Sequence, residues 1–339
     1  MNDAARYQVL DRAPAQWRDR LLRWETILLI VLSAVIVFNT LQSPYFLDLY
    51  NLSDTTQNFS EKAIVALGMA LLILVREIDL SVAAIVALAS LAIGFAAKAG
   101  WAPAGLFAVG ILVGLACGAF NGFLVTAFGL PSIVVTIGTM SLYRGIAHVA
   151  LGDQAITGYP SPYTDLAQNF LVDWPPVYLA FVIFIALALC FGAMLHLTAW
   201  GRALYAIGNN PVAARFSGIR VDRIRFVLFA ITGALAGLAG ALLTARIGST
   251  RPNIALGWEL EIVTMVVLGG VSIAGGAGTV PGVVLAVFVL GLTTFGMTLL
   301  NVPGIVINVI LGCLLIAAIA VPIVLRRAGT LKPRMGRRS

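Results

Sequence analysis

Charged residues are scarce in this sequence. They make up 11% of its 339 residues, and the mean hydropathy is +0.97. Soluble globular domains carry about 25% charged residues, so the composition excludes an ordinary soluble fold. Membrane-spanning helices need about 20 mostly apolar residues each, and such segments tile nearly all of residues 27–325. The sequence therefore predicts an all-α polytopic membrane protein.

The chain also lacks the motifs of hydrolases and metalloenzymes. The glycine-rich turns Gly269-Gly270 and Gly275 to Gly278 have no Gly-Lys-Ser/Thr ending, and neither G-x-S-x-G nor H-E-x-x-H occurs. The three cysteines, Cys117, Cys190 and Cys313, lie far apart in apolar runs. They are typical of small buried side chains and form neither a disulfide framework nor a metal site. We expect no catalytic residue, no metal and no cofactor in this chain.

Ionisable residues are rare inside the predicted spans. Ion-coupled carriers place such residues deep in their helices, so the shortage disfavours that mechanism and leaves a passive carrier open. Arg76, Glu77 and Asp79 cluster at an expected cytoplasmic turn. Asp79, together with Ser81, either caps the next helix or lies in a translocation path.

The positive charge gathers in three intervals. Of the 22 Lys and Arg residues, five lie in residues 1–25, five in 199–225 and six in 326–339. The positive-inside rule places such intervals in the cytoplasm, so the net charge of +7 indicates topology and not nucleic-acid binding. We expect a cytoplasmic tail at 1–25 without signal-peptide design, one transmembrane domain at 26–325 with a cytoplasmic loop at 199–225, and a basic cytoplasmic tail at 326–339.

With both termini in the cytoplasm, the number of spans is even, and about ten are expected. Two apolar runs, 63–75 and 262–273, are short, as in helices that are broken or line a cavity. The first crosses the membrane only if it begins near Phe59. The stretches 43–62, 152–176 and 248–261 are expected outside. The other spans are expected at 26–41, 80–97, 103–128, 131–151, 177–198, 226–245, 280–300 and 304–325.

Glycines repeat at helical spacing in two spans. A smooth glycine face lets the backbone of a neighbouring helix approach closely in lipid. Asn121 lies beside one such face and should point into the bundle, because an amide is costly against lipid. The expected packing glycines are Gly110, Gly114, Gly118, Gly122, Gly233, Gly237 and Gly240.

Hydroxyl groups form a stripe along the span 131–151. Ser132, Thr136, Thr139 and Tyr143 follow one another at i, i+4, i+7 and i+11. Such side chains can bind the hydroxyls of a sugar, or they can bond to carbonyls of their own helix. With Asp79 and Asn121, they are the candidate residues of a translocation path.

The interval Gly201 to Arg225 is the most polar and basic part of the interior. Asn210 suits an N-cap, Pro211 the first helical position and Gly218 the left-handed residue after the end. They frame a helix of about two turns. The apolar side chains of Val212, Phe216 and Ile219 share one face of it, away from Arg215. A helix this short needs a surface to dock on, either its own protein or membrane, or a partner subunit.

This interval resembles a known family. Gly208-Asn209-Asn210-Pro211, Ala213-Ala214-Arg215 and Ser217-Gly218-Ile219, followed by residues 236–240 (AGLAG), are similar to the cytoplasmic coupling segment of bacterial ABC importer permeases of the ribose, xylose and galactose type. Within 249–304 the chain is also similar to permeases for deoxyhexoses such as rhamnose.

Three more blocks of the chain resemble the same family, in order. They are Leu67-Gly68-Met69 with residues 78–82 (IDLSV), residues 121–145, and residues 257–279. The first block departs from the family, because Arg76-Glu77 stands where the family has a glycine pair.

The resemblance implies a half-transporter without its own ATPase site. Two permease subunits, identical or related, would enclose the path for a monosaccharide across the bacterial inner membrane. Two cytoplasmic ATPase subunits would bind ATP and Mg²⁺, and an outer sugar-binding protein would deliver the solute. The resemblance assigns ATPase coupling to Gly208, Asn209, Asn210, Pro211, Val212, Ala213, Ala214, Arg215, Phe216, Ser217 and Gly218. The alternative is a self-sufficient passive facilitator or channel for a small neutral solute.

Overall fold

A computed structural model describes residues 24–314, 316 and 320. Nearly all of the expected N-terminal tail, the whole C-terminal tail and most of the final span after residue 314 lie outside this range, so those expectations stay predictions.

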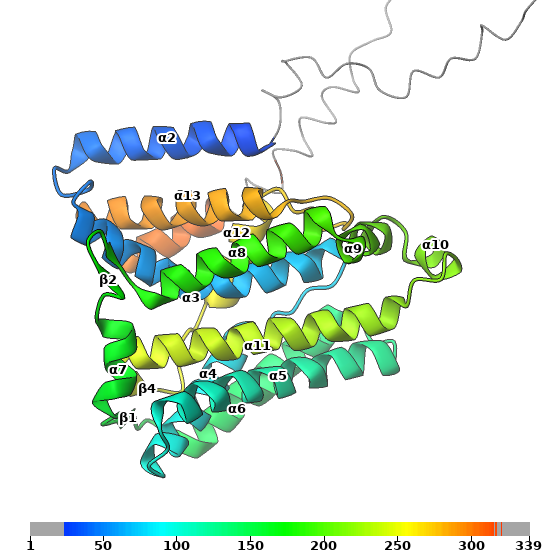
Figure 1. The fold of residues 1–339 in the computed structure, drawn as a ribbon, viewed down its shortest axis with the longest axis horizontal. Coiled ribbons are helices and arrows are strands. Elements are labelled where there is room, and N and C mark those ends of the chain that lie inside the picture. Colours follow the sequence, from blue (N-terminus) through cyan, green and yellow to red (C-terminus); the bar gives the residue numbers. More distant parts are fainter. Residues whose placement is uncertain (1–23, 315, 317–319, 321–339) are drawn as a thin grey trace, which may run out of the picture.

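The described chain is a bundle of helices that run side by side (Figure 1). Helix α2 lies along one edge against α13, and α5 and α6 lie along the opposite edge. The long and intermediate helices are α2 (Trp24–Gln42), α3 (Leu49–Leu74), α4 (Val82–Lys98), α5 (Pro103–Ala127), α6 (Ser132–Leu151), α8 (Leu179–Leu197), α9 (Ala199–Asn209), α11 (Val221–Ile247), α12 (Trp258–Leu268) and α13 (Val280–Leu299). The short elements are β1 (Ile156–Thr157), α7 (Ser161–Gln168), β2 (Val172–Asp173), β3 (Pro176–Val177), α10 (Pro211–Phe216) and β4 (Ser249–Thr250).

Seven of the helices in the described part of the chain are long and apolar enough to cross a membrane: α2, α3, α5, α6, α8, α11 and α13. Helix α4 and the helix Gly304–Leu314 are apolar but shorter, and α12 has 11 residues. The protein is thus an all-α polytopic membrane protein, as predicted. A helix overlaps each of the ten expected spans, the last of them over residues 304–314, and the count of ten crossings stays a prediction.

Helix α3 corrects the expected boundary of the second span. It is unbroken over 26 residues, so most of the stretch 43–62, expected on the outer side of the membrane, is helical. One of its buried charges is paired inside the bundle: Oε1 of Glu61 accepts a hydrogen bond of 2.7 Å from Arg246 of α11. A buried charge is tolerated when a partner of opposite sign is held beside it. The sequence pattern of one segment does not reveal that partner.

The two expected outer stretches 152–176 and 248–261 also contain regular structure. Strands β1 and β4 pair antiparallel, with Ile156 opposite Thr250, and β2 pairs with β3. Helix α7 packs on α11, where the Tyr163 hydroxyl donates to the Ala241 carbonyl at 2.7 Å. These elements lie at the end of the bundle opposite α9 and α10 (Figure 1). We call the α7 and β4 end the far end, and the α9 and α10 end the coupling end.

Helices α5 and α11 contact each other through glycine. A Cβ atom added at Gly114 would lie 2.2 Å from the carbonyl oxygen of Gly233, and one added at Gly237 would lie 2.1 Å from that of Gly110. Gly118 faces the backbone of α11 in the same way. Gly122 has more room, with the Phe229 side chain 3.0 Å from its added Cβ, and Gly240 faces α4. The backbones of α5 and α11 therefore meet with no side chain between them.

The cysteines differ from expectation at two positions. Cys117 is buried, whereas Cys190 and Cys313 are exposed on the surface of the chain, and all three are free thiols. The prediction of buried side chains is wrong for the latter two. An apolar run in a membrane protein often faces lipid, so it does not imply burial within the chain.

Candidate functional site

Helix α10 is built by its caps. The Oδ1 atom of Asn210 accepts hydrogen bonds of 3.0 Å from the backbone N–H groups of Val212 and Ala213. Pro211 is the first helical residue, and Gly218 has a φ of 83° just after the end. The predicted start, first residue and left-handed end of this helix are confirmed. Figure 1 shows α10 projecting beyond the rest of the bundle.

The projecting helix exposes apolar side chains. Val212 is 60% exposed and Phe216 89% exposed, while Ala214 is buried against the chain. The Arg215 guanidinium lies 2.5 Å from the Asp222 carboxylate at the start of α11. Arg215 thus braces α10 against α11, and the two large apolar groups are left uncovered by the described chain. All of Gly208 to Gly218 lies in this projection or at its root.

The six predicted path residues are all buried inside the chain, and those of α6 run from Ser132 at the coupling end to Tyr143 more than halfway along the helix. Asp79 accepts hydrogen bonds from the backbone N–H (2.9 Å) and hydroxyl (2.6 Å) of Ser81. The Asn121 amide of α5 donates to Ser81 Oγ at 2.8 Å. The Tyr143 hydroxyl of α6 donates to the Cys117 carbonyl at 3.1 Å and lies 3.3 Å from the Asn121 amide oxygen. These groups form one buried polar network.

The other hydroxyls of the stripe bind backbone. Thr136 donates to the carbonyl of Ser132 at 2.8 Å, and Ser132 accepts from the backbone N–H of Ile78. Thr139 donates to the carbonyl of Thr136. Their place in a translocation path stays a prediction, because their hydrogen bonds also suit a structural role.

Asp79→Asn measures that structural role. Asparagine would point an N–H₂ group at donors that now bond to a carboxylate, so one buried donor loses its partner, which costs about 1–3 kcal/mol. We expect a lower thermal midpoint in detergent and an unchanged midpoint for Lys98→Asn, an exposed residue at the far end. Equal midpoints for Asp79→Asn and the parent would contradict this role.

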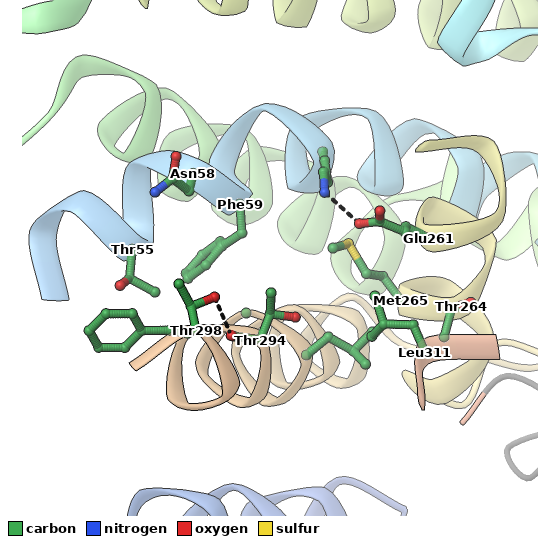
Figure 2. A pocket seen from close by; sticks show the side chains of 13 residues that line it. Thr55, Asn58, Phe59, Glu261, Thr264, Met265, Thr294, Thr298 and Leu311 are labelled. Atoms are coloured by element: carbon green, nitrogen blue, oxygen red, sulfur yellow. Dashed lines mark hydrogen bonds and ion pairs between the residues drawn. The ribbon is translucent and has the colours of Figure 1, made fainter. Parts of the chain in front are cut away.

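A separate cavity of about 270 Å³ lies between α3, α12, α13 and the helix Gly304–Leu314 (Figure 2). Figure 2 shows Thr55 and Asn58 of α3 on one side and Thr294 and Thr298 of α13 on the other. Liquid water occupies about 30 Å³ per molecule, so the cavity has room for a solute of several heavy atoms. Its lining residues are Thr55, Asn58, Phe59, Lys62, Glu261, Thr264, Met265, Leu290, Gly291, Thr294, Phe295, Thr298 and Leu311.

The charges of this cavity are paired with each other. Lys62 Nζ lies 2.5 Å from Glu261 Oε2 and 5.2 Å from the centroid of the Trp258 ring. The remaining polar groups are neutral. Thr55, Thr264 and Thr298 donate their hydroxyl protons to carbonyls of their own helices. A hydroxyl that donates in this way keeps two lone pairs as acceptors, so the wall is neutral and rich in acceptors.

Sequence reasoning missed this cavity. Thr55, Asn58 and Lys62 lie at i, i+3 and i+7, and Thr294 and Thr298 at i and i+4, so each set shares one helix face. The first set belongs to the stretch 43–62, and that stretch was expected on the outer side of the membrane with no helix assigned to it. Read as a helix, the stretch shows a polar face.

A second cavity, of about 650 Å³, lies at the coupling end. The turn at residues 125–131 forms one wall, and Glu77, Arg215, Asp222 and Arg225 form the other. It separates the α5–α6 connection from the base of α10 and α11. Among the described residues, no three His, Cys, Asp or Glu side chains are placed to hold a metal ion.

Most of this chain is similar in sequence to known proteins. The family described as "Branched-chain amino acid transport system / permease component" matches residues 51–319. The chain is 35% identical over 283 residues to the autoinducer 2 import system permease protein LsrC of Yersinia enterocolitica serotype O:8 / biotype 1B, with 82% of this chain and 76% of that protein covered. The protein of the same name from Yersinia pseudotuberculosis serotype O:1b is also 35% identical, with 82% and 78% covered. No solved structure matches this chain significantly.

Proposed function

This chain belongs to the branched-chain amino acid transport permease family, and from this premise we propose that it carries a small, neutral, hydroxyl-rich solute such as a monosaccharide into a bacterial cell. It is the permease subunit of an ABC importer, as the sequence predicted, and ATP hydrolysis belongs to a partner subunit. The passive facilitator is not favoured, because the family and the relatives are components of transport systems.

The exposed face of α10 is the observation that carries the coupling proposal. Val212 and Phe216 are large, apolar and uncovered on a capped helix beyond the bundle. Aromatic anchors that fill a partner's pocket supply much of the binding energy of an interface. The proposed occupant is a groove on the ATPase subunit, which pulls on α10 when ATP brings two such subunits together.

The proposed orientation places the coupling end in the cytoplasm of a bacterial inner-membrane protein. Arginines gather at this end, and the positive-inside rule puts them on the cytoplasmic side. The far end, with α7 and the paired strands, then faces outward to meet a solute-binding protein. The arginines in question are Arg76, Arg202, Arg215, Arg220, Arg223 and Arg225.

The lining of the 270 Å³ cavity supports the proposal of a neutral, hydroxyl-rich solute. A sugar offers hydroxyl protons, and the threonines of the wall offer acceptors. An amino acid would bring two charges, but Lys62 and Glu261 already neutralise each other. Phe59 and Met265 supply apolar surface for the C–H face of a sugar ring. The wall therefore fits a neutral polyol better than a zwitterion.

Reconstitution tests the function. The chain would be placed in liposomes with an ATPase subunit and a solute-binding protein of the same transport system. L-Rhamnose, D-ribose, D-xylose and L-leucine would be supplied as radiolabelled solutes. We expect ATP-dependent uptake of a sugar only by the complete assembly. Equal flux from the purified chain alone would overturn the proposal in favour of a passive facilitator, and uptake restricted to leucine would overturn the solute class.

Thr294→Val and Thr298→Val test the cavity. Each change removes acceptors and keeps the shape, and loss of a hydrogen bond worth about 1 kcal/mol slows passage about five-fold. The measurement is the initial uptake rate at saturating solute-binding protein. Thr293→Val is the matched control, since Thr293 neighbours Thr294 on α13 and does not line the cavity. Equal rates for all three variants would remove the cavity from the path.

A further inference from the structure

We propose that Arg76 and Glu77, in the connection between α3 and α4, form a clasp that joins the coupling helix α10 to the membrane helices. The inference rests on the proposed ATP-driven function and adds the residues through which force passes. We call residues 75–81 the clasp segment. It lies at the coupling end, between the end of α3 and the start of α4.

Arg76 binds the root of α10. Its Nε donates to the carbonyl of Gly208 at 2.6 Å, and its Nη2 donates to the carbonyl of Asn209 at 2.7 Å. These carbonyls end α9, where a helix leaves backbone acceptors unpaired. Asn210, the next residue, caps α10. One guanidinium therefore fixes the two residues from which the coupling helix emerges.

The backbone of Arg76 is held in an unusual conformation. Its φ is 70°, a left-handed value that costs free energy for any residue with a side chain. Glycine would adopt this φ without that cost but could not reach Gly208 and Asn209. The hydrogen bonds of the guanidinium thus offset this conformational cost. A strained backbone persists only where surrounding contacts hold it in place.

The backbone at Gly208 and Asn209, from which α10 emerges, is closely packed against its neighbours. The backbone N–H of Gly276 donates to the carbonyl of Leu74 at 2.9 Å. A Cβ atom added at Gly208 would lie 2.0 Å from that same carbonyl oxygen and 2.3 Å from the nitrogen of Gly276. The ends of α3 and α9 and the turn before α13 thus touch backbone to backbone. A displacement of the α9 end must move its neighbours too.

Glu77 extends the clasp to α11. Its carboxylate lies 3.1 Å from Arg225 Nε, and its side chain is almost fully buried. Breaking a buried ion pair by removing one partner leaves an uncompensated charge, so the pair holds the base of α11 to the clasp segment. The Arg215–Asp222 pair ties α10 to the same base. Helix α10 is therefore linked to the clasp segment from both of its ends.

The remaining clasp residues reach α5 and α6. The backbone N–H of Ile78 donates to Ser132 at the start of α6, and Asp79 accepts from Asn121 of α5. One segment therefore contacts the coupling helix root, α5, α6 and α11. The 650 Å³ cavity beside Glu77 and Arg225 leaves space between that base and residues 125–131. The contacts of the clasp segment transmit movement between these helices. The 650 Å³ cavity gives the base of α11 room to move.

Label mobility tests the clasp without any partner subunit. The three cysteines are first replaced, and a spin label is placed at Val212→Cys on α10 or at Lys98→Cys at the far end. We expect Arg76→Gly, which removes both hydrogen bonds and relieves the left-handed strain, to increase the mobility of the label at 212 and to leave that at 98 unchanged. Unchanged mobility at 212 in a monodisperse protein would overturn the clasp.

Charge exchange tests its role in transport. In the complete assembly, Glu77→Arg and Arg225→Glu should each lower the number of solutes imported per ATP hydrolysed by about five-fold or more. The double variant should recover to within about two-fold of the parent, because it restores the ion pair in the opposite orientation. Lys98→Ala is the charge control at the far end. A double variant no better than either single variant would overturn the role of Glu77.

The two experiments separate two failures. If the parent assembly shows no ATP-driven uptake, the proposed function fails, while the label at 212 still decides whether Arg76 holds the coupling helix. If uptake is normal and Arg76→Gly changes neither the label nor the solute-to-ATP ratio, the clasp alone is wrong.

Discussion

Gly114→Ala should sharply reduce the amount of folded protein. The added Cβ would lie 2.2 Å from the Gly233 carbonyl oxygen and 2.7 Å from the backbone nitrogen of Gly237. Backbone atoms cannot rotate out of the way as a side chain can, so α5 and α11 must separate. Overpacking costs about 1–3 kcal/mol where side chains can adjust, and we expect the upper end here. The thermal midpoint in detergent should fall by on the order of 10 °C.

The matched control is Gly138→Ala on α6. Nothing lies within 4 Å of a Cβ atom added there, so alanine gains helix propensity without a clash. We expect its midpoint to equal or exceed that of the parent. Gly233→Ala, whose added Cβ would lie 2.3 Å from the Gly114 carbonyl oxygen, should be as damaging as Gly114→Ala. A Gly114→Ala protein as stable as the Gly138→Ala protein would show that α5 and α11 are not in backbone contact.

Phe216→Asp should abolish uptake while the chain still folds and inserts. The side chain is 89% exposed, so it contributes almost nothing to the folding stability of the described chain. In the proposed ATPase groove it is a central apolar anchor, and such anchors contribute about 2–4 kcal/mol to binding. A buried unpaired carboxylate adds a further penalty. We expect the uptake rate to fall by about 100-fold or more. We also expect the ATPase subunit to dissociate from the permease during purification.

Phe216→Leu serves as the matched control. It keeps an apolar side chain on the same face of α10 and should retain most of the uptake. Thermal midpoints of the permease alone should be the same for the parent, Phe216→Leu and Phe216→Asp. Normal uptake by Phe216→Asp would remove the exposed face of α10 from the ATPase interface.

Local features could be predicted because they depend on residues near one another in the chain. The Asn210 cap, the Pro211 start and the Gly218 end of α10 all follow from the preferences of those residues, and the structure contains them. Apolar runs likewise placed the helices, because a backbone in lipid must satisfy its own hydrogen bonds. Helix α9 was missed, since its N-cap Thr198 and its first residues, Ala199 to Arg202, are also typical of a loop.

Long-range features could not be predicted in the same way. The stretch 43–62 is polar and was assigned outside the membrane, yet Arg246, 185 residues after Glu61 in the chain, pairs with that carboxylate. The 270 Å³ cavity has the same origin, because its walls come from α3, α12 and α13. Asn121 was correctly expected to point into the bundle, and only the coordinates showed that Asp79 and Asn121 belong to one network.

By itself, the sequence determined that this protein is a helical membrane permease with a short capped helix on a basic loop. Hydropathy, charge bias and capping act over a few residues, so they are legible in a single segment. Only the tertiary structure decided which glycines face each other, where a cavity opens and what Arg76 holds. Those answers depend on pairs such as Arg76 and Gly208, 132 residues apart in the chain, which only the packing of the helices brings into contact.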